Sequence, residues 1–170
     1  MKKLILICGP NGVGKTTLTI ALNRKLINSA LVEPEWCRMI NPFFFNDEIN
    51  NLSISNMTQL LRSYLLCSSI EYVIFNYGFH GPRKMIYDKV MENLKDITFD
   101  FIPITINCEE QENINRMIED ERDEDRIKRA LSIRYMYDKL EYPTIDTTNL
   151  TVEETLDKII DIINSKQKVY

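Results

Sequence analysis

Gly9-Pro10-Asn11-Gly12-Val13-Gly14-Lys15-Thr16 fits the pattern G-x-x-x-x-G-K-[ST] at every fixed position, and this stretch decides the fold of the chain. A triphosphate must be surrounded by backbone N–H groups, and glycines let the backbone come close and adopt positive φ. We expect Lys15 to reach the outer phosphates and the Thr16 hydroxyl to ligate Mg²⁺. With Thr17, the next residue, this stretch predicts the binding site of a nucleoside triphosphate.

The residues on either side of this stretch provide the context that the motif requires. Residues 2–8 (KKLILIC) form an apolar run of strand length, and residues 16–26 place Leu18, Leu22 and Leu26 at helical spacing. A strand, a glycine-rich loop and a helix N-terminus together make a phosphate-binding unit. This order distinguishes the motif from an ordinary glycine-rich turn.

Size and charge limit the classes of protein to consider. The chain has 170 residues, of which 44% are hydrophobic, and a formal net charge of -4. We expect one compact domain over residues 1–170, monomeric or weakly dimeric, with a substantial core. The negative charge argues against a broad basic face for polymeric nucleic acid, although a local basic patch stays open.

The cysteines and the apolar runs bear on where the protein works. Cys8, Cys37, Cys67 and Cys108 form no C-x-x-C pair and have no histidine at metal spacing, so we interpret them as reduced core thiols. The apolar run after Met1 is too short for a secretion signal, and no run approaches the roughly 20 residues of a membrane span. These features predict a cytoplasmic protein with no membrane partner.

Apolar strands alternate with helical patterns along the whole chain. We predict strands at 2–8, 30–33, 71–76, 99–107 and 143–147, and helices at 16–26, 52–70, 83–94, within 109–140, and after the capping box of Thr151 and Glu154. Pro103 argues against a wholly regular fourth strand. The alternation predicts an α/β fold with a parallel sheet covered on both faces and a site at the carboxyl ends of the strands.

The chain resembles the small P-loop kinases in four features. These are the phosphate-loop motif, a carboxylate after the second strand, a glycine loop after the third and an arginine-rich charged segment after the fourth. This group of kinases includes adenylate, shikimate and gluconate kinases, and the resemblance spans nearly the whole chain. It implies a three-layer α/β/α P-loop NTPase fold, a five-stranded parallel sheet in order 2-3-1-4-5 and a short helical lid. It also implies ATP and Mg²⁺ as cofactors, and transfer of the γ-phosphoryl group to a small-molecule acceptor.

A lid segment is expected at about residues 109–129. Arg122, Arg126 and Arg129 fall at i, i+4 and i+7, so a continuous helix would place them on one face that could close over the phosphates. We assign Arg122 and Arg126 to the catalytic set with Lys15. A solvated helical hairpin held by acid-before-base pairs is the alternative for this segment.

The resemblance also implies how the base of the nucleotide is held. Arg116 matches the position where family members stack an arginine on adenine. Thr148, in the loop 147–149, matches the opposite wall of that site. The preference for ATP over GTP stays open.

Two acidic residues after the second strand are candidates for the acceptor side. Glu35 matches the carboxylate that accepts the proton of the attacking hydroxyl, and Glu33 is either that base or an outer-shell ligand to the metal. Two exposed acids at a strand end are the alternative. Arg83 and Arg62 are further candidates to hold the acceptor, with a surface position favoured for Arg62.

Arg38 lies three residues after Glu35, and this E-x-x-R arrangement resembles the D-x-x-R of polynucleotide 5'-hydroxyl kinases. His80 follows the third strand beside the expected acceptor pocket, where a plain polar loop residue is the favoured interpretation. Trp36 and the aromatic run 43–45 could form a wall of that pocket, although such a cluster is more often core.

Asn76 departs from the pattern of many P-loop enzymes, which end the third strand in an aspartate that holds Mg²⁺ or its water. An amide can orient a metal-bound water but adds no negative charge. We therefore expect slow turnover, or compensation by Glu33.

Three hypotheses follow from the sequence. The first is an ATP-dependent kinase acting on a small molecule with an alcohol or phosphate acceptor. The second is a nucleotide-binding regulatory module with little turnover, which Asn76 makes credible. The third, suggested by Glu35 and Arg38, is a kinase acting on the 5'-hydroxyl end of a nucleic acid, since an end-binding site needs few phosphate contacts.

Overall fold

A computed structural model describes residues 1–165 and shows strands alternating with helices along the chain. The elements in chain order are β1 (Lys3–Cys8), α1 (Lys15–Lys25), β2 (Ser29–Val32), the 3-10 helix η1 (Trp36–Arg38), α2 (Asp47–Leu66), β3 (Tyr72–Tyr77), α3 (Arg83–Glu92), β4 (Asp100–Asn107), α4 (Glu110–Glu119), α5 (Glu124–Ser132), α6 (Tyr135–Asp138), β5 (Thr144–Asp146) and α7 (Val152–Ser165).

The five strands form one parallel sheet in the order β2-β3-β1-β4-β5, which confirms the predicted fold and strand order. β1 lies at the centre, where Leu6 faces Phe75 of β3 on one side and Pro103 of β4 on the other. β5 pairs only from Thr105 onward, so β4 has a strand neighbour on just one side at Pro103. A proline is tolerated there because the second ladder has not yet begun.

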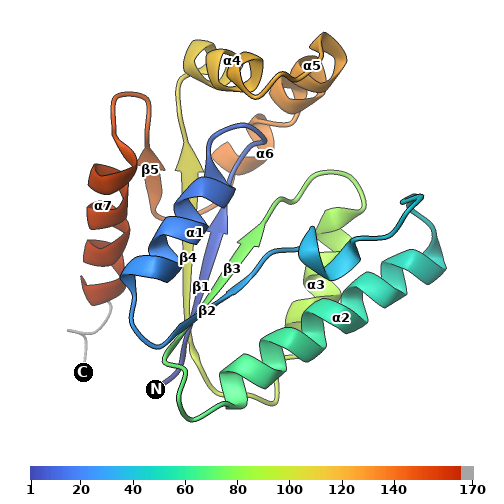
Figure 1. Cartoon of the computed structure of the whole chain (residues 1–170), viewed down its shortest axis with the longest axis vertical. Helices are drawn as coiled ribbons and strands as arrows, with labels where there is room; N and C mark the ends of the chain where they lie inside the picture. Colours follow the sequence, from blue (N-terminus) through green and yellow to red (C-terminus); the bar gives the residue numbers. More distant parts are fainter. Residues whose placement is uncertain (166–170) are drawn as a thin grey trace.

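Two helical layers cover the sheet because alternate side chains of each strand point to opposite faces. Leu4 and Leu6 of β1 pack in the core beneath α2 and α3, whereas Ile5 and Ile7 pack beneath α1 and α7. Figure 1 shows this arrangement, with α4 and α5 standing above the carboxyl ends of the central strands. The two cores fix the sheet rigidly between the layers and leave its carboxyl edge open for a site.

Several local predictions are corrected by the structure. The second helix begins at Asp47, earlier than predicted, because the Asn46 side chain accepts a hydrogen bond from the Ile49 N–H at 2.8 Å and caps it. Trp36 and the run 43–45 are exposed, so the core interpretation of these aromatics is wrong. Their segment joins β2 to α2 and contacts α2 through η1, where the Cys37 carbonyl accepts from the Asn56 side chain at 2.9 Å, but these aromatic rings themselves stay in solvent.

The interpretation of the cysteines as core thiols holds for part of the set. Cys8 and Cys108 are buried, but Cys67 is exposed because it follows the last residue of α2 at the edge of the molecule. The capping box is confirmed: the Thr151 hydroxyl accepts from the Glu154 N–H, and the Glu154 carboxylate accepts from the Thr151 N–H. Within residues 1–165, no helix is both long and apolar enough to cross a membrane.

Candidate nucleotide and acceptor site

The loop between β1 and α1 has the backbone geometry that a phosphate-binding loop needs. Gly9, Gly12 and Gly14 all have positive φ, at 150°, 84° and 92°. Gly14 caps α1 in the left-handed conformation, so the first N–H groups of that helix open toward the loop. Because a helix N-terminus attracts anions, this end of α1 is suited to phosphate.

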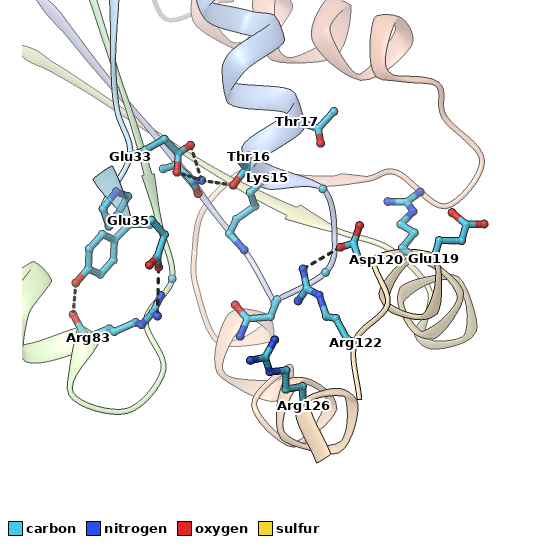
Figure 2. Close-up of a pocket in the computed structure, with 18 residues that line it drawn as sticks. Lys15, Thr16, Thr17, Glu33, Glu35, Arg83, Glu119, Asp120, Arg122 and Arg126 are labelled. Atoms are coloured by element: carbon cyan, nitrogen blue, oxygen red, sulfur yellow. Dashed lines mark hydrogen bonds and ion pairs between the residues drawn. The ribbon is translucent and has the colours of Figure 1, made fainter. Parts of the chain in front are cut away.

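A cavity of about 910 Å³ lies in front of this loop. Its walls come from the phosphate loop, the ends of β2 and β3, the loop before α3, and the lid segment 109–129, as Figure 2 shows. The lining residues are Asn11, Gly12, Gly14, Lys15, Thr16, Thr17, Glu33, Pro34, Glu35, Asn76, Tyr77, Gly78, Arg83, Arg116, Glu119, Asp120, Arg122 and Arg126. Most of the predicted site residues therefore share one cavity.

Lys15 begins α1 and turns back over its own loop, where its Nζ donates to the Pro10 carbonyl at 2.7 Å. Burial, together with the nearby cations Arg83 and Arg122, lowers the pKa of Lys15 to about 8. A bound phosphate would supply the missing counter-charge. The lysine is thus placed to exchange a carbonyl partner for a phosphate oxygen.

Glu33 and Asn76 form a buried pair beside Thr16. The Asn76 amide lies 2.7 and 2.8 Å from the two Glu33 oxygens and 3.1 Å from the Thr16 hydroxyl oxygen. The Thr19 hydroxyl also donates to Glu33 at 2.8 Å. Glu33 is only 3% exposed, so the alternative of two exposed acids at the strand end is wrong for this residue.

Burial raises the pKa of Glu33, and the hydrogen bonds from Asn76 and Thr19 oppose that rise. The negative charge that many P-loop enzymes place at the end of β3 is here carried on the loop after β2. Asn76 holds that carboxylate in place through its amide. The amide at the end of β3 is therefore accompanied by a carboxylate within hydrogen-bond distance.

Glu35 lies between two arginines on the acceptor side of the cavity. It forms an ion pair with Arg38, whose side chain is only 2% exposed, and a looser one with Arg83 at 3.4 Å. Burial would raise the pKa of Glu35, but the bonds and charges of Arg38 and Arg83 lower it below its usual value. Glu35 is therefore ionised at neutral pH and can accept a hydrogen bond from a hydroxyl.

The lid segment does not form the continuous helix on which the arginine spacing depended. α4 ends at Glu119 and α5 begins at Glu124, because Glu121 takes a positive φ of 56° in the turn between them. Arg122 lies in this turn and pairs with Asp120 at 2.9 Å, while Arg126 lies on α5. Both still line the cavity.

Arg129 is not one of the lining residues and instead donates to the Asp125 carbonyl on its own helix. The break leaves Arg122 in the turn before the helix that carries Arg126 and Arg129, so the single helical face predicted for the three arginines does not form. Arg62 likewise lies away from the cavity, where it forms a bidentate pair with Asp96. The surface position favoured for Arg62 agrees with this placement.

Arg116 separates the large cavity from a second one of about 320 Å³. Its guanidinium donates to the Val13 carbonyl at 3.2 Å and to the Thr147 hydroxyl and carbonyl at 2.9 and 2.8 Å. The second cavity is lined by Val13, Gly14, Thr17, Leu18, Arg116, Thr147, Leu150, Thr151, Val152 and Thr155. A partly apolar hollow beside the phosphate loop suits a planar base.

Thr148 does not line this hollow. Its hydroxyl binds the Asp146 carboxylate and accepts from the Glu109 N–H at 2.8 Å, whereas Thr147 faces Arg116. Of the loop 147–149, only Thr147 lines the hollow. The neighbouring residue, Thr147, therefore occupies the wall.

Four other predicted residues lie beside the large cavity without lining it. Gly9 and Pro10 form the start of the phosphate loop, and Arg38 is buried behind Glu35. His80 is half-buried, its Nδ1 has no hydrogen-bond partner among residues 1–165, and burial lowers its pKa to about 4. A neutral imidazole packed on the loop agrees with the interpretation of His80 as a plain loop residue.

Several residues that support the site carried no signal in the sequence. Asn113 of α4 is fully buried, donates to the Asn11 carbonyl of the phosphate loop at 3.0 Å and accepts from Arg134 at 2.7 Å. The Tyr137 hydroxyl accepts from the Phe79 N–H at 3.0 Å, linking α6 to the loop after β3. These contacts join segments far apart in the chain, so no local pattern reveals them.

The donors present fit a magnesium ion that keeps most of its waters. Within residues 1–165 no three His, Cys, Asp or Glu side chains cluster into a metal cage. The Thr16 hydroxyl and the Glu33 carboxylate lie on either side of the Asn76 amide. The hydroxyl could ligate the ion directly, and the carboxylate could bind it through a water. Mg²⁺ bound to nucleotide phosphates needs no more from the protein.

The sheet order, the loop and the cavity define the chain as an α/β P-loop protein with the fold of the small P-loop kinases. A family model described as an AAA domain matches residues 5–137, and the chain belongs to this family. No curated protein matches the sequence significantly.

Solved structures with a similar fold are distant in sequence. The tunicamycin resistance protein of Deinococcus radiodurans has a TM-score of 0.70 at 22% identity, with 96% of each chain covered. Shikimate kinase from Acinetobacter baumannii has a TM-score of 0.66 at 18% identity, covering 100% of this chain and 97% of its own. A gluconokinase from Sinorhizobium meliloti 1021 has a TM-score of 0.64 at 12% identity, covering 96% and 92%. These similarities confirm the predicted kinase-like fold.

Proposed function

We propose that this protein is an ATP-dependent kinase that transfers the γ-phosphoryl group of Mg-ATP to a hydroxyl or phosphate group of a small molecule. One observation carries the proposal: the phosphate loop, an ionised carboxylate on the acceptor side and two lid arginines line the same cavity. Phosphoryl transfer asks a protein for positioning and for positive charge around the transferred group, and these residues supply both.

Each side of the cavity has its own task in this reaction. The backbone of the phosphate loop and Lys15 hold the β- and γ-phosphates, while Arg122 and Arg126 neutralise the charge that spreads over the γ-phosphoryl oxygens. Thr16 would hold Mg²⁺ directly, and Glu33 and Asn76 would hold it through water. The bound ion would supply further positive charge at the phosphates. Arg116 and the hollow beside it receive the base.

For a hydroxyl acceptor, Glu35 orients the attacking group. The acceptor oxygen forms a bond to the γ-phosphorus, the bond from that phosphorus to the bridging β–γ oxygen breaks, and ADP leaves. The acceptor proton passes to the Glu35 carboxylate and then to water. Because Arg38 and Arg83 lower the pKa of Glu35, it acts mainly by orienting the hydroxyl, which a carboxylate can do without a raised pKa.

The test is ADP release from Mg-ATP across a library of sugars, sugar acids, nucleosides and nucleotides. We expect one acceptor class to stimulate release by the native protein and not by Lys15→Met. Lys25→Met is the matched control, because Lys25 ends the same helix and pairs only with exposed acids of α7. Glu35→Gln should lower acceptor-stimulated release at least tenfold while leaving ATP binding within about threefold.

Two other outcomes would replace the proposal. ATP binding without release by any acceptor would favour a regulatory module, the alternative that Asn76 suggests. Phosphorylation of an oligonucleotide 5'-hydroxyl end, with binding that weakens steeply as salt rises, would favour a nucleic-acid end kinase. The ion pair between the exposed Glu35 and the buried Arg38 is the observation that keeps this second alternative in the test.

A further inference from the structure

A group of large apolar side chains is exposed directly after the second strand. Trp36, Met39, Phe43, Phe44 and Phe45, which we call the aromatic patch, lie within one short segment, and Trp36 and Phe44 are 56% and 53% exposed. Single exposed apolar residues are common, but a run of aromatic rings left in water marks a surface that binds something.

The aromatic patch lies next to the acceptor side of the cavity, although none of its five side chains lines that cavity. η1 follows Glu35 immediately, and the buried Arg38 guanidinium pairs with Glu35 on one side. The same guanidinium lies 5.4 Å from the ring centre of Phe43 and 6.0 Å from that of Phe45. The rings of the patch therefore begin one side chain away from the carboxylate that lines the cavity (the place of Glu35 is shown in Figure 2).

Two rings of the patch are held in place and two are left free for a ligand. Phe43 and Phe45 pack edge to face at 5.1 Å and stack against Arg38, so they are fixed relative to Glu35. Phe44 and Trp36 present more than half of their surface to water. An acceptor whose hydroxyl reaches Glu35 would extend its remaining body toward these rings.

We propose that the aromatic patch is the subsite for a planar ring of the acceptor, and that the acceptor is therefore an alcohol carrying such a ring, as in a nucleoside or an aryl glycoside. The inference rests on the kinase function proposed above and names its substrate class. A ring gains stacking and apolar burial on this surface, whereas a polyol or sugar acid gains neither and loses water from its hydroxyls.

The test uses pairs of ligands that differ only in the ring: uridine against ribose, and phenyl β-glucoside against methyl β-glucoside. Trp36 is the only tryptophan in the chain, so its fluorescence reports binding at the patch directly, without turnover. We expect uridine and phenyl glucoside to change Trp36 emission saturably, and to bind at least about tenfold more tightly than their ring-free partners.

Two serine substitutions separate the patch from general surface effects. Phe44→Ser should weaken binding of uridine and phenyl glucoside about five- to tenfold and leave ribose unchanged. Ile27→Ser is the matched control, because Ile27 is 82% exposed in the turn between α1 and β2, away from the carboxyl ends of the strands. It should change neither ligand pair.

Three results would overturn the inference: equal binding within both ligand pairs, unchanged ring binding in Phe44→Ser, or a self-association that Phe44→Ser abolishes while no ring ligand binds. The last would assign the patch to a second copy of the chain.

Ring binding measured in Lys15→Met separates this inference from the proposed function. If the native protein binds ring ligands but transfers no phosphoryl group to them, only the proposed kinase function is contradicted. If it phosphorylates ring-free alcohols and Trp36 emission does not respond to ring ligands, only the ring subsite is contradicted.

Discussion

At the scale of single residues, the structure gives Asn76 and Glu33 a different interpretation from the one that the sequence suggests. A neutral amide at the end of the third strand first suggests weak metal binding and slow turnover. The structure places the Glu33 carboxylate against that amide, 2.7 and 2.8 Å from its nitrogen. An aspartate at position 76 would set two carboxylates against each other, so the amide and the acid are best understood as a matched pair.

Asn76→Asp should therefore destabilise the protein instead of restoring a better metal site. At pH 8 we expect a loss of about 2 kcal/mol in the free energy of unfolding, because the buried acids repel one another. The loss should shrink toward pH 5, because a proton shared by the two acids relieves their repulsion. Acids whose pKa is raised in the folded protein bind more protons in the folded than in the unfolded state, so the stability of the variant falls as pH rises.

Urea unfolding at both pH values measures this effect. The double variant Glu33→Gln with Asn76→Asp exchanges the amide and the acid, and it should recover most of the lost stability at pH 8. If Asn76→Asp alone is as stable as the native protein at that pH, the two side chains do not form the pair described here.

His80 gives a pH dependence of stability with the opposite sign. Its pKa is lowered to about 4 by burial, so between pH 6.5 and 4 the unfolded chain binds a proton that the folded protein does not. Stability is therefore complete above pH 6.5 and is lost as pH falls through this window, by on the order of 1 kcal/mol after allowance for solvent screening.

Comparison with His80→Asn isolates this contribution. The difference in unfolding free energy between native protein and variant should change between pH 7 and pH 4.5, with the native protein losing more. A constant difference over that range would show that His80 does not titrate with a lowered pKa.

At the scale of elements, the glycines of the phosphate loop meet different neighbours. A Cβ on Gly9 would lie 2.1 Å from the Ile106 carbonyl oxygen of β4, whereas a Cβ on Gly14 would meet nothing within 4 Å. Both have positive φ, but only Gly9 is packed against the backbone of the sheet. The first glycine of the motif therefore serves the close packing of the loop on β4.

Gly9→Ala should lower the unfolding free energy by more than about 3 kcal/mol, because β4 cannot move without breaking the sheet. Gly14→Ala should cost about 1–2 kcal/mol, which is the strain of a left-handed alanine alone. Urea unfolding of both variants without nucleotide makes the comparison. Equal losses would contradict the steric explanation.

Helix α4 is fastened to the phosphate loop through Asn113. This residue is fully buried and connects the Asn11 carbonyl to Arg134, so its loss removes one hydrogen bond from each of two partly buried groups. We expect Asn113→Ala to reduce the unfolding free energy by about 1–3 kcal/mol and to weaken nucleotide binding, although Asn113 does not line the cavity.

Asn115→Ala is the matched control on the same helix, because Asn115 is exposed and bonded only to Gln111. It should change stability by less than about 0.5 kcal/mol. Fluorescent nucleotide titration and urea unfolding of both variants measure the two effects. Native-like nucleotide affinity in Asn113→Ala would show that α4 does not support the loop.

At the scale of the whole molecule, the cavity is closed by segments distant in sequence, among them the turn that carries Arg122 and the helix α5 that carries Arg126. We expect Arg126→Ala to lower kcat/KM at least 10²-fold with little change in stability, because Arg126 lines the cavity and is otherwise exposed. Arg129→Ala should stay within about threefold, because Arg129 does not line the cavity and donates instead to the Asp125 carbonyl of its own helix.

Steady-state kinetics on the acceptor found in the library screen would compare these variants. Equal losses in both would indicate that the lid segment acts through its overall charge and not through one placed guanidinium. Equal and native-like activity in both would remove the lid arginines from the mechanism.

The sequence by itself determined the parts that depend on local pattern. The phosphate loop, the alternation of strands and helices and the capping box at Thr151 are each written in a few neighbouring residues, and residue spacing reveals them. The strand order followed from the resemblance to small P-loop kinases, which the motif made specific. For the same reason Lys15, Thr16 and the acids after β2 could be named as candidates.

Only the tertiary structure decided what those residues touch. The pairing of Glu33 with Asn76, the separation of Arg126 from Arg129, the exchange of Thr148 for Thr147 and the exposure of residues 43–45 all depend on contacts between elements. The turn at Glu121 ends α4 before α5 begins, so helical spacing could not place Arg122 on one face with Arg126 and Arg129. Local chemistry therefore specified the kind of site, and packing between distant segments specified its geometry.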